Sequence, residues 1–207
     1  MSHSGRPWPF LPSVPFTGIS SSLCILNVRN VSGRLEYHYG IFSKMFGGNR
    51  RRACMFNAGI IFGLTLLRDY AYHRALDDCH ASYSLRSMNI VYFGYAMLAM
   101  GAVFVASAYY RLGIVGTYLG DHFGILMDKK VEGFPFNVLA HPMYEGASMI
   151  FMGWGLVKRK ISGLVLSMWA YSVYMLMAKT FEEPFTNHIY NTSKKKSTAA
   201  VEKNKSE

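Results

Sequence analysis

Charged residues are scarce in this sequence. They make up 16% of its 207 residues, against about 25% in an average soluble domain, while hydrophobic residues make up 51%. Such a deficit excludes an ordinary soluble domain and predicts a membrane protein. The length suits one domain, which we expect at residues 1–190, followed by a disordered basic tail at 191–207.

The signatures of several kinds of chemistry are absent as well. There is no phosphate-binding GxxxxGKS/T loop, no GxGxxG dinucleotide fingerprint and no GxSxG nucleophile elbow. The three cysteines, at positions 24, 54 and 79, lack metal-ligand spacing and the even number of a disulfide framework. We therefore expect no metal site. The proline-rich start has no charged segment ahead of an apolar core, so we expect no cleaved signal peptide.

Basic residues give the chain a net charge of +10, but they cluster beside apolar segments at 50–52, at 158–160 and in the tail. Such clusters are typical of topology signals and of contacts with anionic lipid, and they do not indicate nucleic-acid binding. The tail lysines favour the cytosol. Lys203 and Lys205 also resemble a dilysine retrieval signal, so we expect a multi-pass protein of the endoplasmic-reticulum membrane.

Four apolar segments are candidates for insertion into a membrane. Residues 88–110 form the clearest span, with 23 residues and no charge. Residues 53–67 form a second span, which a polar loop at 69–87 follows. The segments 143–157 and 161–179 predict a tight helical hairpin with the basic cluster at its tip. We expect an all-α integral membrane protein with about four membrane-embedded helices, including this C-terminal hairpin.

The N-terminal stretch at 14–28 is short and rich in serine, which favours an interfacial helix over a span. Arg34 follows it, on an ordinary charged juxtamembrane helix or in contact with a lipid headgroup. If Arg50–Arg52 and the tail are cytosolic, four embedded segments also place the loop at 116–146 in the cytosol. The hairpin tip then violates the positive-inside tendency, and a three-span version would put that loop in the lumen.

The segment from Gly116 to Gly146 combines glycine, proline and polar side chains between two apolar spans. Ordered polar loops between rigid elements are common places for functional sites. This loop contributes Asp121, His141 and Tyr144, and the hairpin returns Glu182 and Glu183 to the same side. The adjacent glutamates are either solvated at an interface or hold a cation.

Ala99-Met100-Gly101 lies inside the clearest span. Small residues on a membrane helix usually permit close helix packing. The alternative is that this triplet opens space for a ligand against the helix backbone. The spacing of the triplet leaves both interpretations open.

Four segments carry a resemblance to a known family: GTYLGDHFGIL, FPFNVLAHPMYEGAS, MGWGL and FEEPFTNHIY. They closely resemble the phospholipid N-methyltransferases, and the resemblance extends over about residues 25–190, including NVRNVSGRLEYHYG. It implies methyl transfer from S-adenosylmethionine to phosphatidylethanolamine and its mono- and dimethyl forms, toward phosphatidylcholine. A single-domain chain of this size more often resembles the members that favour the later methylations, and the sequence leaves the preferred step of the three open. An isoprenylcysteine carboxyl methyltransferase and a non-catalytic lipid-binding protein are the alternatives.

The resemblance also assigns residues to the methyl donor. In this family a GxG triplet at the end of a span and a pair of glutamates bind S-adenosylmethionine. The corresponding positions here are Ala99-Met100-Gly101 and Glu182-Glu183, with alanine in place of the first glycine. The extra methyl group puts the closeness of that contact in doubt.

The expected chemistry suggests roles for the remaining residues. Methyl transfer to an amine needs alignment above all, and the amine must lose a proton before attack. His141 either orients the cofactor or accepts that proton, unless it only caps the hairpin, and Asp121 is an alternative acceptor. Tyr144 can offer its ring to a methylated ammonium. We expect Arg34, Lys129 and Lys130 to contact the phosphate of a lipid that enters laterally.

Overall fold

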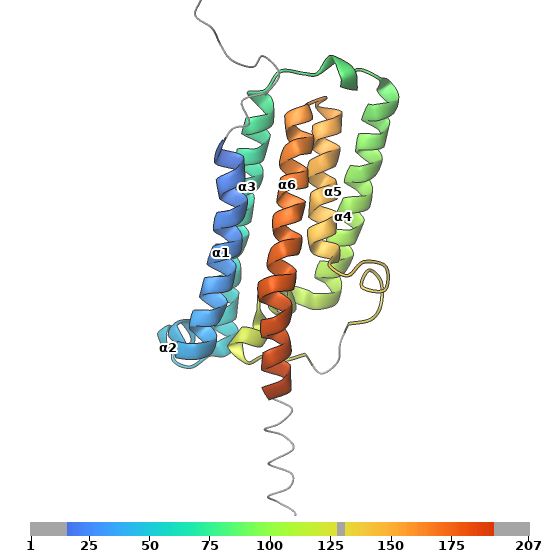
Figure 1. Cartoon of the computed structure of the whole chain (residues 1–207). Helices are drawn as coiled ribbons and strands as arrows, with labels where there is room; N and C mark the ends of the chain where they lie inside the picture. The colour runs from blue at the N-terminus through green and yellow to red at the C-terminus, as the bar shows by residue number, and fades with distance from the viewer. Residues whose placement is uncertain (1–15, 128–130, 193–207) are drawn as a thin grey trace, which may run out of the picture.

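The structure is a computed structural model that describes residues 16–127 and 131–192, with side chains from residue 28 onward. Every regular element in these two ranges is helical, which confirms the expected all-α architecture (Figure 1). Two helical stretches, Met88–Phe123 and Ile161–Thr192, are long and apolar enough to cross a membrane. The five long helices are α1 (Phe16–Tyr39), α3 (Arg50–Asp77), α4 (Met88–Thr117), α5 (Pro142–Val157) and α6 (Ile161–Met177).

Four short elements connect or extend these helices. The α-helix α2 (Ile41–Met45) joins α1 to α3, and the 3-10 turn η1 (Tyr83–Leu85) lies between α3 and α4. A second 3-10 turn, η2 (Gly120–Phe123), follows α4. The π-helical turn η3 (Ala178–Glu182) follows α6, and the α-helix then resumes over residues 183–192.

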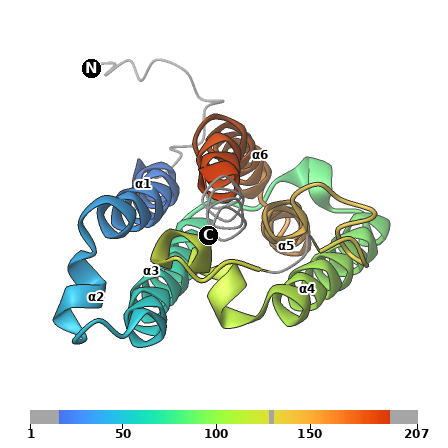
Figure 2. The same cartoon turned by 90° about the horizontal axis from the view of Figure 1, so that it is seen from below.

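Viewed from below, the long helices form an open ring in the order α3, α1, α6, α5, α4 (Figure 2). The pair α4 and α5 makes the most extensive contact, whereas α3 touches α4 only sparsely. The ring is therefore weakest along the seam between α3 and α4.

Three expectations differ from the structure. The expected N-terminal interfacial helix is instead α1, which stands upright in the bundle beside α3 and α6 (Figure 1). The expected polar loop at 69–87 is shorter, because α3 continues as a helix to Asp77. The helical segment expected at 161–179 is longer, because it continues through the π turn η3 and a further helix to residue 192. Most of the expected tail, from residue 193, lies outside the described residues.

Glycines let α4 and α5 approach closely. A β-carbon on Gly101 would lie 2.6 Å from the carbonyl oxygen of Gly146, and one on Gly153 would lie 2.8 Å from the carbonyl oxygen of Gly94. In each helix the two glycines are seven residues apart, so they recur on one face after two turns. The small residues of the 88–110 span therefore include two that serve helix packing.

The basic hairpin tip is tied to the loop between α3 and α4. Lys158 Nζ lies 2.6 Å from Asp77 Oδ1, and its hydrogen bond holds the pKa of Asp77 below the ordinary value. Lys160 donates to the carbonyl oxygen of Cys79, and the Ser82 N–H donates to the Arg159 carbonyl oxygen at 2.8 Å. The basic residues at 158–160 therefore stabilise the fold at this end of the bundle, which explains their presence where the positive-inside tendency predicts few basic residues.

The variant Gly101→Val should destabilise the bundle, since even a β-carbon at this position would press on the α5 backbone. Overpacking of this kind costs about 1–3 kcal/mol. We expect a lower Tm in detergent, measured as the fraction that survives heating on size-exclusion chromatography. Ala99→Val changes an exposed side chain two residues away and should keep the wild-type Tm. Equal losses in both variants would contradict the packing role.

Candidate functional site

Three side chains from distant parts of the chain meet at the lower end of the bundle. The Tyr144 hydroxyl donates to Glu182 Oε1 at 2.7 Å, and Arg29 Nη1 lies 3.3 Å from the same oxygen. The Arg29 guanidinium also donates to the Tyr144 hydroxyl. We call Arg29, Tyr144 and Glu182 the Arg29 cluster. It joins α1, the first turn of α5 and the π turn after α6 around one mostly buried carboxylate.

Local sequence explains how this carboxylate is presented. Pro184 has no N–H and its ring would clash with a preceding carbonyl in a regular α-helix. The chain widens into the π turn Ala178–Glu182 just before this proline and then resumes as a helix. Such π turns are frequent at functional sites because they change which way a side chain faces. Glu182, the last residue of this turn, thereby faces Arg29.

Tyr144 is held in place by packing as well as by hydrogen bonds. Pro142 occupies the first turn of α5, where a missing N–H costs nothing. The Tyr144 ring stacks on Tyr174 of α6, with centroids 5.2 Å apart. The stacked pair fixes the ring, so the hydroxyl is directed at Glu182.

Glu183 contacts a different partner from the adjacent Glu182. Its Oε1 lies 2.9 Å from His141 Nε2, and its side chain is half exposed. His141 is the N-cap residue of α5 and forms no side-chain cap there, so its imidazole is engaged by Glu183 and not by the hairpin. The two adjacent glutamates thus serve two separate contacts, one inside the bundle and one at its surface.

Asp121 forms a third acidic position on this end. Its Oδ1 lies 2.9 Å from His122 Nδ1, and its Oδ2 accepts from Thr186 Oγ1 at 3.1 Å. Asp121 also lines a cavity of about 210 Å³ together with Arg29 and Glu182. Among the described residues no group of His, Cys, Asp or Glu side chains could hold a metal ion.

A larger cavity of about 410 Å³ begins at Arg29 and Tyr144 and extends up the bundle. Ligand pockets commonly have volumes of about 300–1,000 Å³. Its walls come from α1, α3, α4, α5 and α6, so it lies beside the loosely packed seam between α3 and α4. Arg29 lines both cavities.

Two buried polar atoms at this cavity have no hydrogen-bond partner among the described residues: Arg29 Nε and Thr117 Oγ1. Buried polar groups without partners are rare, because each costs about 1–3 kcal/mol. Both atoms belong to residues of the cavity wall. Two residues of the cavity wall therefore have unused hydrogen-bonding capacity.

The structure brings together five of the predicted site residues. His141, Tyr144, Asp121, Glu182 and Glu183 all lie at the lower end of the bundle, as the hairpin model predicts.

The other predicted residues do not join this group. Ala99 and Met100 are exposed on α4 and line neither cavity, and Gly101 packs on α5. The Arg34 guanidinium lies over the rings of Phe181 and Phe185, beside the site. Lys129 and Lys130 lie outside the described residues.

Sequence reasoning missed Arg29, Thr186 and Arg68. Arg29 directly follows the stretch at 14–28, whose serine content favours an interfacial helix. Thr186 lies three and four residues after the two glutamates, which is helical spacing. Arg68 faces the larger cavity from α3, where its Nε and Nη2 lie 3.0 and 2.8 Å from Asp69 Oδ1. A charged residue directly after an apolar segment such as 53–67 is the signal that could have drawn attention to Arg68.

Comparison with known proteins decides the family. A family model described as phospholipid methyltransferase matches residues 89–193, about half of the chain. The chain belongs to the phospholipid methyltransferase family. This methyltransferase is therefore an enzyme of lipid metabolism, and the match favours the lipid-directed interpretation over the prenylcysteine alternative.

Named relatives agree with the family match. A phosphatidyl-N-methylethanolamine N-methyltransferase from Neurospora crassa is 48% identical over 161 residues, or 78% of this chain and 75% of the relative. A Saccharomyces cerevisiae protein of the same name is 45% identical, over 78% of this chain and 77% of its own. A phosphatidylethanolamine N-methyltransferase from Rattus norvegicus is 40% identical, over 78% and 80%. No solved structure matches the chain.

The variant Tyr144→Phe removes the hydroxyl that donates to Glu182 and keeps the ring that stacks on Tyr174. A hydrogen bond to a charged group contributes about 1.5–3 kcal/mol. We expect a lower Tm in detergent together with loss of most methyltransferase activity. Tyr171→Phe, which alters an exposed hydroxyl one turn from Tyr174 on α6, should match the wild type in both measurements. A fully active, fully stable Tyr144→Phe would contradict this role.

Proposed function

We propose that this phospholipid methyltransferase transfers a methyl group from S-adenosylmethionine to the amine of phosphatidylethanolamine or its mono- and dimethyl forms. The observation that carries the proposal is the Arg29 cluster. Its Glu182 carboxylate lines the cavity of about 210 Å³, and its Arg29 and Tyr144 line the cavity of about 410 Å³. Both reactants of such a transfer carry positive charge near the reacting atoms. A fixed carboxylate in a low-dielectric setting attracts that charge strongly.

The residues present fit S-adenosylmethionine. Its sulfonium and amino groups are cationic, and Glu182 and Asp121 supply carboxylates to the smaller cavity, with Glu183 next to Glu182 at the surface. Its carboxylate and hydroxyl groups need donors and acceptors, and Arg29 and Thr117 in the cavity wall both have unused hydrogen-bonding capacity. Gly101 contributes indirectly, because its contact with Gly146 sets the distance of α5, and so of Tyr144, from α4.

The donor supplies an activated methyl group, and the lipid amine attacks that methyl carbon from the side opposite the sulfur. A carbon–nitrogen bond forms, the carbon–sulfur bond breaks, and the electron pair of that bond stays on sulfur. The protein's contribution is alignment and exclusion of water. The rings of Tyr144 and Tyr174 line the cavity and can present their faces to a methylated ammonium.

His141 is the residue that we assign to the amine proton. Its Nε2 is paired with Glu183, whose side chain is half exposed, so a proton taken by the imidazole has a route to water. Asp121 is already engaged by His122 and Thr186. The pairing with Glu183 also fixes the ring next to Tyr144, whose centroid lies 6.2 Å away.

The lipid should enter sideways through the seam between α3 and α4. The larger cavity is lined by both helices, and they make little contact with each other. We place the end that carries the Arg29 cluster on the cytosolic side of the endoplasmic reticulum membrane, since Arg50–Arg52 lie at that end (Figure 1). The names of the Neurospora crassa and Saccharomyces cerevisiae relatives support the monomethyl lipid as the preferred acceptor.

Radiolabelled methyl transfer tests the function directly. Purified protein is given labelled S-adenosylmethionine and, separately, phosphatidylethanolamine, its monomethyl form or its dimethyl form. We expect label in the lipid fraction, with the fastest transfer to the monomethyl lipid. A folded protein that binds S-adenosylmethionine but labels none of the three lipids would refute the proposal.

A double-mutant cycle tests the pair of His141 and Glu183. If they act as one unit, His141→Ala and Glu183→Gln should each lower kcat by on the order of 100-fold. The kcat of the double variant should then equal that of the less active single variant. In all three variants the KM for S-adenosylmethionine should change little. Additive losses would show that the two residues act separately, and a raised KM with unchanged kcat would assign His141 to cofactor orientation.

A further inference from the structure

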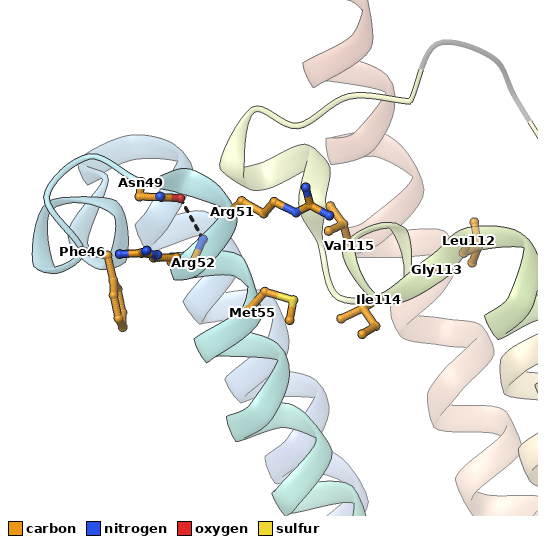
Figure 3. A pocket seen from close by; sticks show the side chains of 9 residues that line it. All are labelled: Phe46, Asn49, Arg51, Arg52, Met55, Leu112, Gly113, Ile114 and Val115. Carbon is orange, nitrogen blue, oxygen red and sulfur yellow. Dashed lines mark hydrogen bonds between the residues drawn. The ribbon is translucent and has the colours of Figure 1, made fainter.

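A third cavity opens at the same end of the bundle, separate from the two cavities that Arg29 lines. It lies where the start of α3 faces the end of α4, and its volume is about 740 Å³. Figure 3 shows Arg51 reaching from α3 toward Val115, while Met55 lies opposite Ile114. Arg52 also lines this groove, but its side chain points the other way, toward Phe46.

Local geometry creates this groove. Gly113 has φ 63° and ψ −179°, which interrupts α4 and bends its last residues away from the helix axis. This left-handed φ suits glycine. On the opposite wall, Asn49 caps α3 by accepting from the Arg52 N–H at 3.1 Å, which fixes the first turn and its arginines. The groove is therefore built into the fold.

The charged side chains of the groove are all positive. Arg51 and Arg52 are exposed, and neither forms an ion pair with any described residue. None of the nine residues that line the groove is acidic, and most are apolar. Two guanidinium groups beside an apolar wall complement a molecule with an anionic head and a hydrocarbon body.

The position of the groove suits the boundary between lipid and water. Met55 and Ile114 are 47% and 41% exposed, so their side chains face outward from the bundle. Beyond them along α3 lie further exposed apolar side chains, such as Phe62 and Leu66. The arginines stand at the polar end of this surface.

We propose that the groove binds one anionic phospholipid, with its phosphate on Arg51 and an acyl chain along Met55 and Ile114, while Arg52 adds positive charge at the edge of the groove. The occupant differs from the methyl acceptor. A substrate amine is cationic and needs a carboxylate, which Glu182 provides at the Arg29 cluster and which this groove lacks. The groove is thus an accessory lipid site.

Lipid retention measured by native mass spectrometry tests this site without using methyl transfer. The protein is released from phosphatidylcholine nanodiscs that contain a minor share of phosphatidylserine. The wild type should retain one phosphatidylserine. Each basic residue near a membrane surface contributes about fivefold in affinity for anionic lipid, so Arg51→Gln/Arg52→Gln should weaken retention about 25-fold. Arg51→Lys/Arg52→Lys keeps the charge and should stay within about fivefold of the wild type.

A matched control is Arg74→Gln/Arg86→Gln, which removes the same charge from exposed residues at the other end of the bundle. It should retain phosphatidylserine like the wild type, and a normal Tm in detergent would show that each variant is folded. The proposal is overturned if the wild type retains no phosphatidylserine or if the glutamine pair at 51 and 52 retains it normally. It is also overturned if the control loses it equally.

Discussion

A carboxylate held inside a membrane bundle is the constraint on which this structure depends. An ionised glutamate in a low-dielectric setting is costly unless it is paired and hydrogen-bonded. Glu182 meets that requirement through Arg29 and Tyr144. Satisfying it requires α1, α5 and α6 to converge at one level, and the π turn before Pro184 to direct the side chain inward. Much of the lower half of the fold follows from this convergence.

The close contact of α4 with α5 supports the same site from the other side. Backbone-to-backbone packing at Gly101 and Gly146 leaves no room for adjustment between these helices. Because Tyr144 is two residues from Gly146, its height and direction are fixed by that contact. A glycine far from the carboxylate can therefore matter to the site without touching any ligand.

Much of the architecture could be predicted from the sequence, and the failures have physical causes. The hairpin of α5 and α6 was predictable because two apolar segments flank a short basic turn. That closure also predicted that His141, Tyr144, Glu182 and Glu183 share one end, as they do. The upright placement of α1 was not predictable, since its low apolar content is compensated only by packing on α3 and α6.

Other features needed the fold itself. The role of Arg29 depends on partners more than one hundred residues away, which no local pattern reveals. The alternatives for Ala99-Met100-Gly101 could be separated only by knowing which face of α4 meets α5. Lys158 lies at the hairpin tip, where the positive-inside tendency predicts few basic residues, and only its ion pair with Asp77 shows what it contributes there.

The weak seam between α3 and α4 has a consequence for the order of events. Under the proposed route, a lipid that enters and leaves sideways stays in one leaflet throughout. Its headgroup gains a methyl group, but the molecule never has to be turned over or extracted into water. A product of one round is then already placed as the reactant of the next. Repeated methylation is governed by how long a lipid stays near the opening, so diffusion within the bilayer becomes part of the enzyme's kinetics.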